Sequence, residues 1–185
     1  MMPTLPRIAL AMLFSAAIGS AHGQDVVSKR NVVGISPFGL INKFRIKYER
    51  VLTPKFTAGA TAAAYYGAYP GVQLTPFGRW YVGAEAPDGL YFQGQIGVYH
   101  HTSTLTVVAN GQDYTEKATI SNAGAGVALG YQWLSGKNKN ISIDINGGLK
   151  VYKTGIEEGG LTGLTWYTFG PGSFYNGLIS MGYAF

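Results

Sequence analysis

Two adjacent histidines and a nearby serine are the residues whose types and spacing could do chemistry in this sequence. His101 and Ser103 are two positions apart, so they share one face if the segment is a strand. A histidine on the same face as a serine can serve as its general base, and Glu116 could orient that histidine. The alternative, which we favour, is that this polar Thr- and Ser-rich segment is a loop without a catalytic role.

A metal or cofactor site is not indicated. Adjacent strand residues face opposite sides, so His100 and His101 cannot bind one ion together. The chain contains no Cys, which excludes a Cys-ligated zinc site and a disulfide framework. The glycines around residues 124–126 do not follow the strand–helix pattern of a phosphate-binding loop. We therefore expect no catalytic residue, no metal and no cofactor.

The composition excludes a helical membrane protein and a charged disordered chain. Charged residues make up 12% of the 185 residues, about half the roughly 25% usual in a soluble domain, and there are 27 glycines. No apolar run reaches the roughly 18 residues of a membrane-spanning helix. The formal charge of +5, which becomes +4 if a leader containing Arg7 is removed, is too small and dispersed to indicate nucleic-acid binding.

Alternation of apolar and polar residues runs through most of the chain. In residues 141–152 the odd positions are Ile, Ile, Ile, Gly, Leu and Val, and the even positions include Ser, Asp, Asn and Lys. A period of two predicts a strand. The same test predicts eight strands, at 31–40, 44–50, 56–66, 72–82, 91–100, 123–133, 141–152 and 177–185. Pro37 and Pro76 each remove a backbone donor and argue against central positions in a sheet.

The connections predict how these strands are joined. Those at 53–55, 83–89 and 135–140 are short and turn-like, and those at 101–120 and 153–176 are long. Short turns at one end and long loops at the other are typical of an outer-membrane barrel. The predicted fold class is therefore all-β, an eight-stranded antiparallel transmembrane β-barrel with short periplasmic turns and longer extracellular loops.

Charge sorting decides between a membrane barrel and a soluble barrel of lipocalin type. The apolar strand faces carry almost no charge, as lipid contact requires, whereas a lipocalin would place its apolar face inside. The charged residues of the other face are expected to form a polar network in the lumen: Arg45, Lys47, Glu49, Arg79, Asp144 and Lys150.

The lumen of an eight-stranded barrel is just wide enough for side chains to fill it, so we expect it to be plugged. Glu49 can pair with Arg45 or Lys47 on its own strand face, and Asp144 shares its face with Lys150. Pairing across strands is not deducible from the sequence. Alternating glycines should make room for bulky inward neighbours.

Aromatic residues of the lipid-facing set are expected to form a girdle at the periplasmic interface. Its members fall near the predicted turn ends of the strands: Tyr48, Phe56, Trp80, Phe92, Trp133 and Tyr183.

The first segment has the features of an export signal. Arg7 precedes an 11-residue apolar stretch, residues 8–18, and small residues follow it, including Ala21 and Gly23. We expect residues 1–23 to be a signal peptide and residues 24–185 to be one barrel domain. Cleavage after Ala21 is the alternative.

The last strand ends in Met-Gly-Tyr-Ala-Phe, with Phe185 on the parity of Tyr183. This segment resembles the C-terminal signature of outer-membrane barrels, which implies that Phe185 is read by the barrel assembly machinery. With residues 73–81, 91–99 and 124–132, the chain resembles a family of small bacterial outer-membrane barrels of uncharacterised function. His101-Thr-Ser103 faintly resembles the His-x-Ser motif of lipid A deacylases, in which an Asn typically follows the Ser; here Thr104 follows it.

The expected function is that of an integral outer-membrane barrel with a structural or surface-interaction role, carried by the long connections. Its expected partners are outer-membrane lipids, lipopolysaccharide and the assembly machinery. The alternatives are a deacylase-like enzyme that uses His101 and Ser103, a small-solute channel, and a soluble binding barrel.

Overall fold

The computed structural model describes residues 29–37, 40, 43–66, 70–83, 85–109, 112–153 and 175–185. For residues 103–109, 112–120 and 153 it describes the backbone. The expected signal peptide at 1–23 and residues 154–174 of the expected second long loop lie outside these ranges. In the described ranges, no helix has the length and apolar character needed to cross a membrane.

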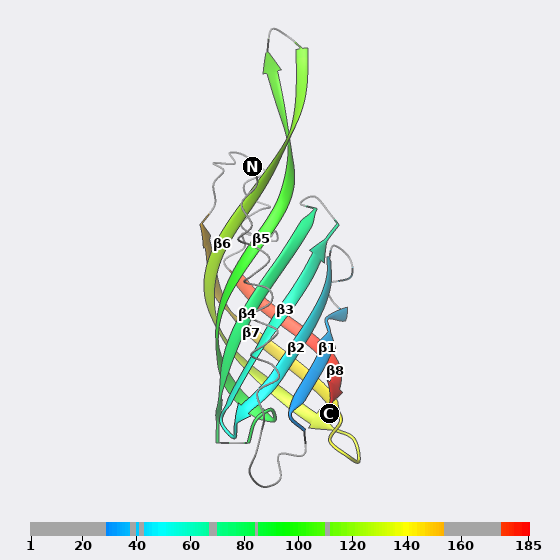
Figure 1. Cartoon of the computed structure of the whole chain (residues 1–185), viewed down its shortest axis with the longest axis vertical. Helices are drawn as coiled ribbons and strands as arrows, with labels where there is room; N and C mark the ends of the chain where they lie inside the picture. Colours follow the sequence, from blue (N-terminus) through cyan, green and yellow to red (C-terminus); the bar gives the residue numbers. More distant parts are fainter. Residues whose placement is uncertain are drawn as a thin grey trace, which may run out of the picture.

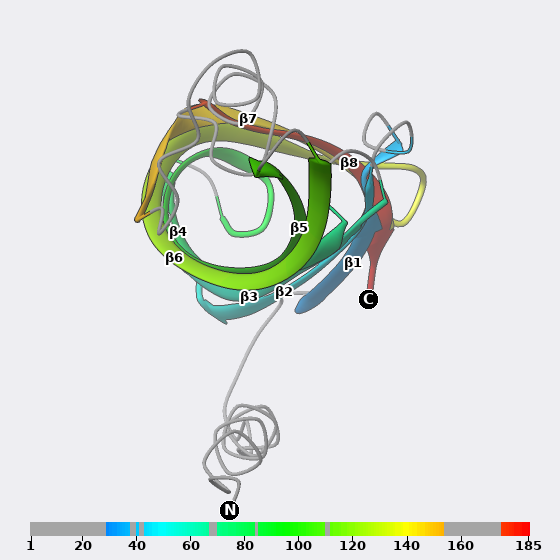
Figure 2. The ribbon, with the colours of Figure 1, turned by 90° about the horizontal axis from the view of Figure 1, so that it is seen from above.

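Eight strands pair in sequence order, and β8 returns to β1, so the sheet closes into a barrel (Figures 1 and 2). Every pair is antiparallel, which confirms the predicted eight-stranded antiparallel barrel. The strands are β1 (Asn31–Ile35), β2 (Lys43–Thr53), β3 (Phe56–Tyr65), β4 (Gly71–Val82), β5 (Gly89–Ala109), β6 (Gln112–Ser135), β7 (Ile141–Lys153) and β8 (Tyr175–Ala184).

The prediction of a long loop at 101–120 is wrong. β5 and β6 stay paired from Gly89↔Gln132 to Ala109↔Gln112, so this segment is mostly strand. Its many Thr and Val residues favour extended backbone, and their polarity misled the loop prediction. On β5, His101 is the last residue that pairs with β4, and on β6, Ala123 is the last that pairs with β7. Beyond these residues the hairpin extends past the other described strands at one end of the barrel (Figure 1). We call this the hairpin end, and the opposite end the turn end.

The two prolines have different consequences. β1 stops at Ile35 rather than continuing to residue 40. The N–H of Ser36 still donates to the carbonyl of Arg45 on β2, but the next residue, Pro37, has no N–H to donate on the β8 side. Pro76 lies inside β4 and is paired with β3, but the β4–β5 register is interrupted between Leu74↔Val98 and Phe77↔Gln95. The missing donor therefore breaks one ladder locally without ending the strand.

The outer surface is apolar on all eight strands. Large aliphatic and aromatic side chains are exposed there, such as Ile96, Val127 and Leu149, which are 60–64% exposed. Of the Lys, Arg, Asp and Glu side chains that the structure describes within strands, Arg50 is the one on the outer face, close to the turn end of β2. The residues that would normally form a core thus cover the outside.

Candidate functional site

The barrel interior contains the polar and charged residues, and its turn end is closed. Val51, Tyr81 and Tyr91 point inward and pack with Ala86 of the β4–β5 turn in one buried cluster. The backbone N–H of Ala86 donates to the carbonyl of Pro54, so this turn is tied to the neighbouring β2–β3 turn. The lumen is therefore covered by packed side chains at this end.

Four fully buried charges lie next to this cluster: Lys47, Glu49, Arg79 and Asp144, which we call the charge cluster. The Lys47 ammonium lies 2.7 Å from Asp144 and 3.2 Å from Glu49. The Arg79 guanidinium lies 2.8 Å from each of the same two carboxylates. Each cation contacts both anions, so the cluster is formally neutral.

Neutral donors and acceptors complete the charge cluster. The hydroxyls of Thr57 and Tyr81 donate to Glu49 Oε1 at 2.6 and 2.9 Å, and Tyr91 donates to Asp144 Oδ1 at 2.5 Å. Gln132 Oε1 accepts from both Lys47 and Arg79. Buried ions are tolerated when their remaining hydrogen-bonding capacity is also used. Here each carboxylate oxygen of Glu49 and Asp144 accepts at least one hydrogen bond.

Arg79 is the centre of the charge cluster. Its Nε donates to Gln93 Oε1 at 2.8 Å, in addition to its bonds to Glu49 and Asp144. Its guanidinium also lies 4.1 Å from the ring centroid of Tyr91 and 4.7 Å from that of Phe77. A planar cation with donors along its edges and aromatic rings nearby can serve several partners at once, which a lysine could not do equally well.

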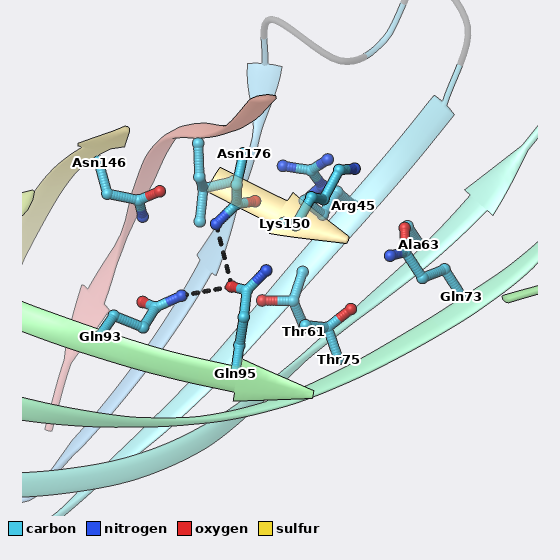
Figure 3. Close-up of a pocket in the computed structure, with 11 residues that line it drawn as sticks. Arg45, Thr61, Ala63, Gln73, Thr75, Gln93, Gln95, Asn146, Lys150 and Asn176 are labelled. Atoms are coloured by element: carbon cyan, nitrogen blue, oxygen red, sulfur yellow. Dashed lines mark hydrogen bonds between the residues drawn. The ribbon is translucent and has the colours of Figure 1, made fainter. Parts of the chain in front are cut away.

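A second group of cations lies toward the hairpin end. Arg45 of β2 and Lys150 of β7 lie side by side over a cavity, together with amide and hydroxyl side chains (Figure 3). Lys150 is within electrostatic range of both Lys43 and Arg45. None of the three is ion-paired with a carboxylate in the described part of the chain. We call Lys43, Arg45 and Lys150 the cation group.

The prediction that Asp144 shares a strand face with Lys150 is correct, but the two side chains do not pair. Lys150 lies six residues along β7, about 20 Å at strand spacing, so the two side chains share a face but cannot meet. Lys47 and Arg79 reach Asp144 from β2 and β4 instead. Of the two partners considered for Glu49, the structure places Lys47 beside it, and Arg45 bonds the Gly177 carbonyl instead.

Inward tyrosines occupy space that facing glycines leave open. A Cβ at Gly130 would overlap the Tyr91 ring, and one at Gly97 or Gly124 would overlap Tyr152. This agrees with the expectation that glycines make room for bulky inward neighbours. Toward the hairpin end, Tyr65 donates to Gln73, which in turn donates to Tyr152. A polar, aromatic layer therefore lies above the cavity.

The histidines face opposite sides, as their adjacency requires. His100 is exposed and within hydrogen-bond distance of Ser121, whereas His101 is buried inside the barrel and stacks on Tyr99 at 4.8 Å. The side chains of Ser103 and Glu116 lie outside the described part. Among the described residues, no three His, Asp or Glu side chains gather as a metal site would require.

The aromatic residues of the expected girdle all lie exposed on the outer face. Phe56, Trp80 and Phe92 are direct partners across β3, β4 and β5, and Trp80 and Phe92 stack at 6.0 Å. The rings of Phe185 and Tyr183 are stacked, with their centroids 6.4 Å apart. The backbone N–H and C=O of Phe185 pair with Asn31, so this residue extends the β1–β8 ladder.

Some functional side chains were not in the expected network. Tyr81 has the parity of Arg79 on β4, and Gln132 lies on the face of β6 opposite to Tyr131 and Trp133. That signal was available in the sequence. Lys43 has the parity of Arg45 but lies one residue before the predicted start of its strand. Thr57 had no signal beyond its parity. Its role depends on the Glu49 side chain that it meets from the next strand.

No family model matches the chain, and comparison with curated proteins found no match. Among solved structures, the chain is similar to the N-terminal β-barrel domain of Pseudomonas aeruginosa OprF. The identity is 15%, the TM-score is 0.40, and the similarity covers 85% of this chain and 98% of that chain. The fold and the interior define a closed eight-stranded β-barrel with a filled, charged lumen.

Proposed function

We propose that the protein is an integral outer-membrane β-barrel with a plugged lumen and a structural or surface-interaction role. The observation that carries this proposal is the apolar outer face of the described strands, which has Arg50 as its one charged side chain, combined with an interior that contains the other charges. Such an exterior is costly in water and favourable in lipid. The expected export signal at 1–23 and the exposed aromatic girdle support an outer-membrane location, with lipids and lipopolysaccharide as neighbours.

A charge on the outer face tests this proposal directly. Val127 is 64% exposed in the middle of β6. In lipid, Val127→Arg should cost about 2–4 kcal/mol and lower the yield of folded barrel in vesicles, measured by heat-modifiable migration on gels. The matched control is Asn138→Arg in the exposed β6–β7 turn, which should fold like the wild type. A chain that is monodisperse without detergent and unaffected by Val127→Arg would contradict the proposal.

The proposed plug makes this chain a closed barrel rather than a pore. If the charge cluster and the packed turn end block the lumen, planar-bilayer recordings should show no steady conductance. An ion-selective current of reproducible size would favour the small-solute channel instead.

We propose no catalytic role for His101 and Ser103. The inward, stacked position of His101 supports this, because a lipid substrate would approach the outer face. If overproduction of the protein altered lipid A, and His101→Ala or Ser103→Ala abolished that change, the deacylase-like enzyme would be the better proposal.

The surface-interaction role would belong to the projecting β5–β6 hairpin. β5 continues eight residues past His101, which is about 26 Å of strand.

For assembly, we propose that Phe185 is recognised by the barrel assembly machinery. Phe185→Ala should then lower the folded fraction in cells, whereas Phe44→Ala, a similarly exposed ring at the other end of the barrel, should not.

A further inference from the structure

The cation group has no anion of its own in the described interior. The two buried carboxylates, Glu49 and Asp144, are each already shared by Lys47 and Arg79. Within the cation group, Lys43 and Lys150 lie against the rings of Tyr65 and Tyr152, at 5.2 and 5.4 Å, and Arg45 donates to the Gly177 carbonyl at 3.2 Å. These contacts orient the cations but do not neutralise them.

The cavity beneath Arg45 and Lys150 is partly open and is lined mostly by polar side chains, with Ala63 and Leu178 as the apolar ones. It leaves about 30 Å³ open to the centres of water-sized atoms, two to three times what a single water needs. Figure 3 shows Asn146, Asn176, Gln95 and Gln73 around it, with Thr61 and Thr75 on the adjoining wall. The lining thus combines a guanidinium, an ammonium, amides and hydroxyls, and it contains no carboxylate.

We propose that this half of the lumen binds a small tetrahedral oxyanion of the phosphate or sulfate class. A planar guanidinium fork and an ammonium are the donors that match such an anion, and amide and hydroxyl groups can donate to its remaining oxygens. Three cations held together in a partly dehydrated space repel one another, and one bound anion would relieve that repulsion. The proposal concerns the interior and does not depend on the function proposed above.

The choice of an oxyanion follows from the charges present. A metal cation would be repelled by the cation group, and a neutral sugar or water cluster would leave the charges uncompensated. Chloride would supply charge but could not use the fork of Arg45 and the surrounding amide donors at the same time.

The experiment uses the chain folded in a nonionic detergent. Thermal unfolding is followed while sodium phosphate replaces sodium chloride at constant ionic strength and pH. We expect the midpoint to rise with phosphate along a saturating curve and sulfate to act similarly. A midpoint that depends on ionic strength alone would overturn the proposal.

Two variants and one control show whether the effect arises in this cavity. Lys150→Gln and Arg45→Gln should each weaken phosphate binding about tenfold or more, because each removes one charge-assisted donor. Lys137→Gln, which removes the same charge from the exposed β6–β7 turn, should bind phosphate like the wild type.

The stability without phosphate gives a second, opposite readout. Because Lys150→Gln removes one of three like charges, it should unfold at the same or a higher temperature than the wild type in chloride, and at a lower temperature in saturating phosphate. This reversal is not expected of a residue that merely supports the fold. If Lys150→Gln and Lys137→Gln bound phosphate equally well, the cavity would not be the site.

Discussion

The two halves of the barrel interior use similar side chains but balance charge differently. Near the turn end, Lys47 and Arg79 each contact both Glu49 and Asp144, and the result is neutral. Near the hairpin end, the three cations of the cation group have amides and aromatic rings for neighbours in the described part of the chain. The charges of the turn-end half balance one another, whereas those of the hairpin-end half could be balanced by a bound anion.

This difference separates two uses of charge inside a barrel. A pair that is fully bonded within the protein closes the lumen and makes it rigid, but it offers nothing to a ligand. Charges left without a counter-ion cost stability, and that cost can be relieved by binding.

The largest effect is expected from Arg79→Met. It leaves Glu49 and Asp144 with Lys47 as their one close cation, so we expect a loss of about 3–5 kcal/mol in the free energy of unfolding. Urea titration in detergent would measure it. Gln93→Ala removes a single neutral acceptor from Arg79 and should cost about 1 kcal/mol.

A double variant shows whether charge balance is the cause. Adding Asp144→Asn to Arg79→Met leaves one cation for one anion. The double variant should therefore lose less free energy of unfolding than the two single variants lose in sum. Strict additivity would contradict the account of the cluster as one unit.

An intermediate effect is expected from Gly130→Val. A side chain there would collide with the Tyr91 ring, whose hydroxyl bonds Asp144, so overpacking should cost about 1–3 kcal/mol. Gly94→Val is the control, because a Cβ at Gly94 meets nothing within 4 Å. Equal losses for the two variants would point to backbone effects rather than to packing of the lumen.

The smallest expected effect is a gain in stability. Gln95 Oε1 accepts hydrogen bonds from Gln93 and Asn176 beside the cation group, and Gln95→Glu keeps an oxygen at that position. The added carboxylate should stabilise the chain by about 1 kcal/mol and weaken the response to phosphate. Lower stability of Gln95→Glu, together with an unchanged phosphate response, would mean that the hairpin-end half has no uncompensated positive charge.

Much of the fold could be predicted because a period of two is a local signal. It gave the inward parity of Glu49, Arg79 and Asp144 and the outward parity of Trp80 and Tyr183. The hairpin at 101–120 was missed because Thr-rich strands that project from a barrel need no apolar face. Contacts such as Lys47 with Asp144 could not be predicted, since they depend on the register and curvature of strands 97 residues apart.

The seam that closes the barrel has a consequence for folding order. β1 and β8 share four residue pairs, whereas β5 and β6 share 21, and the seam joins Val32 to Ala184 across almost the whole chain. Closing such a long loop has a large entropic cost for few contacts, whereas the central hairpin is local. The β5–β6 ribbon should therefore form early and the seam last. Amide protons at the seam should exchange fastest, which would make it the place where the ring opens to an unfolding force.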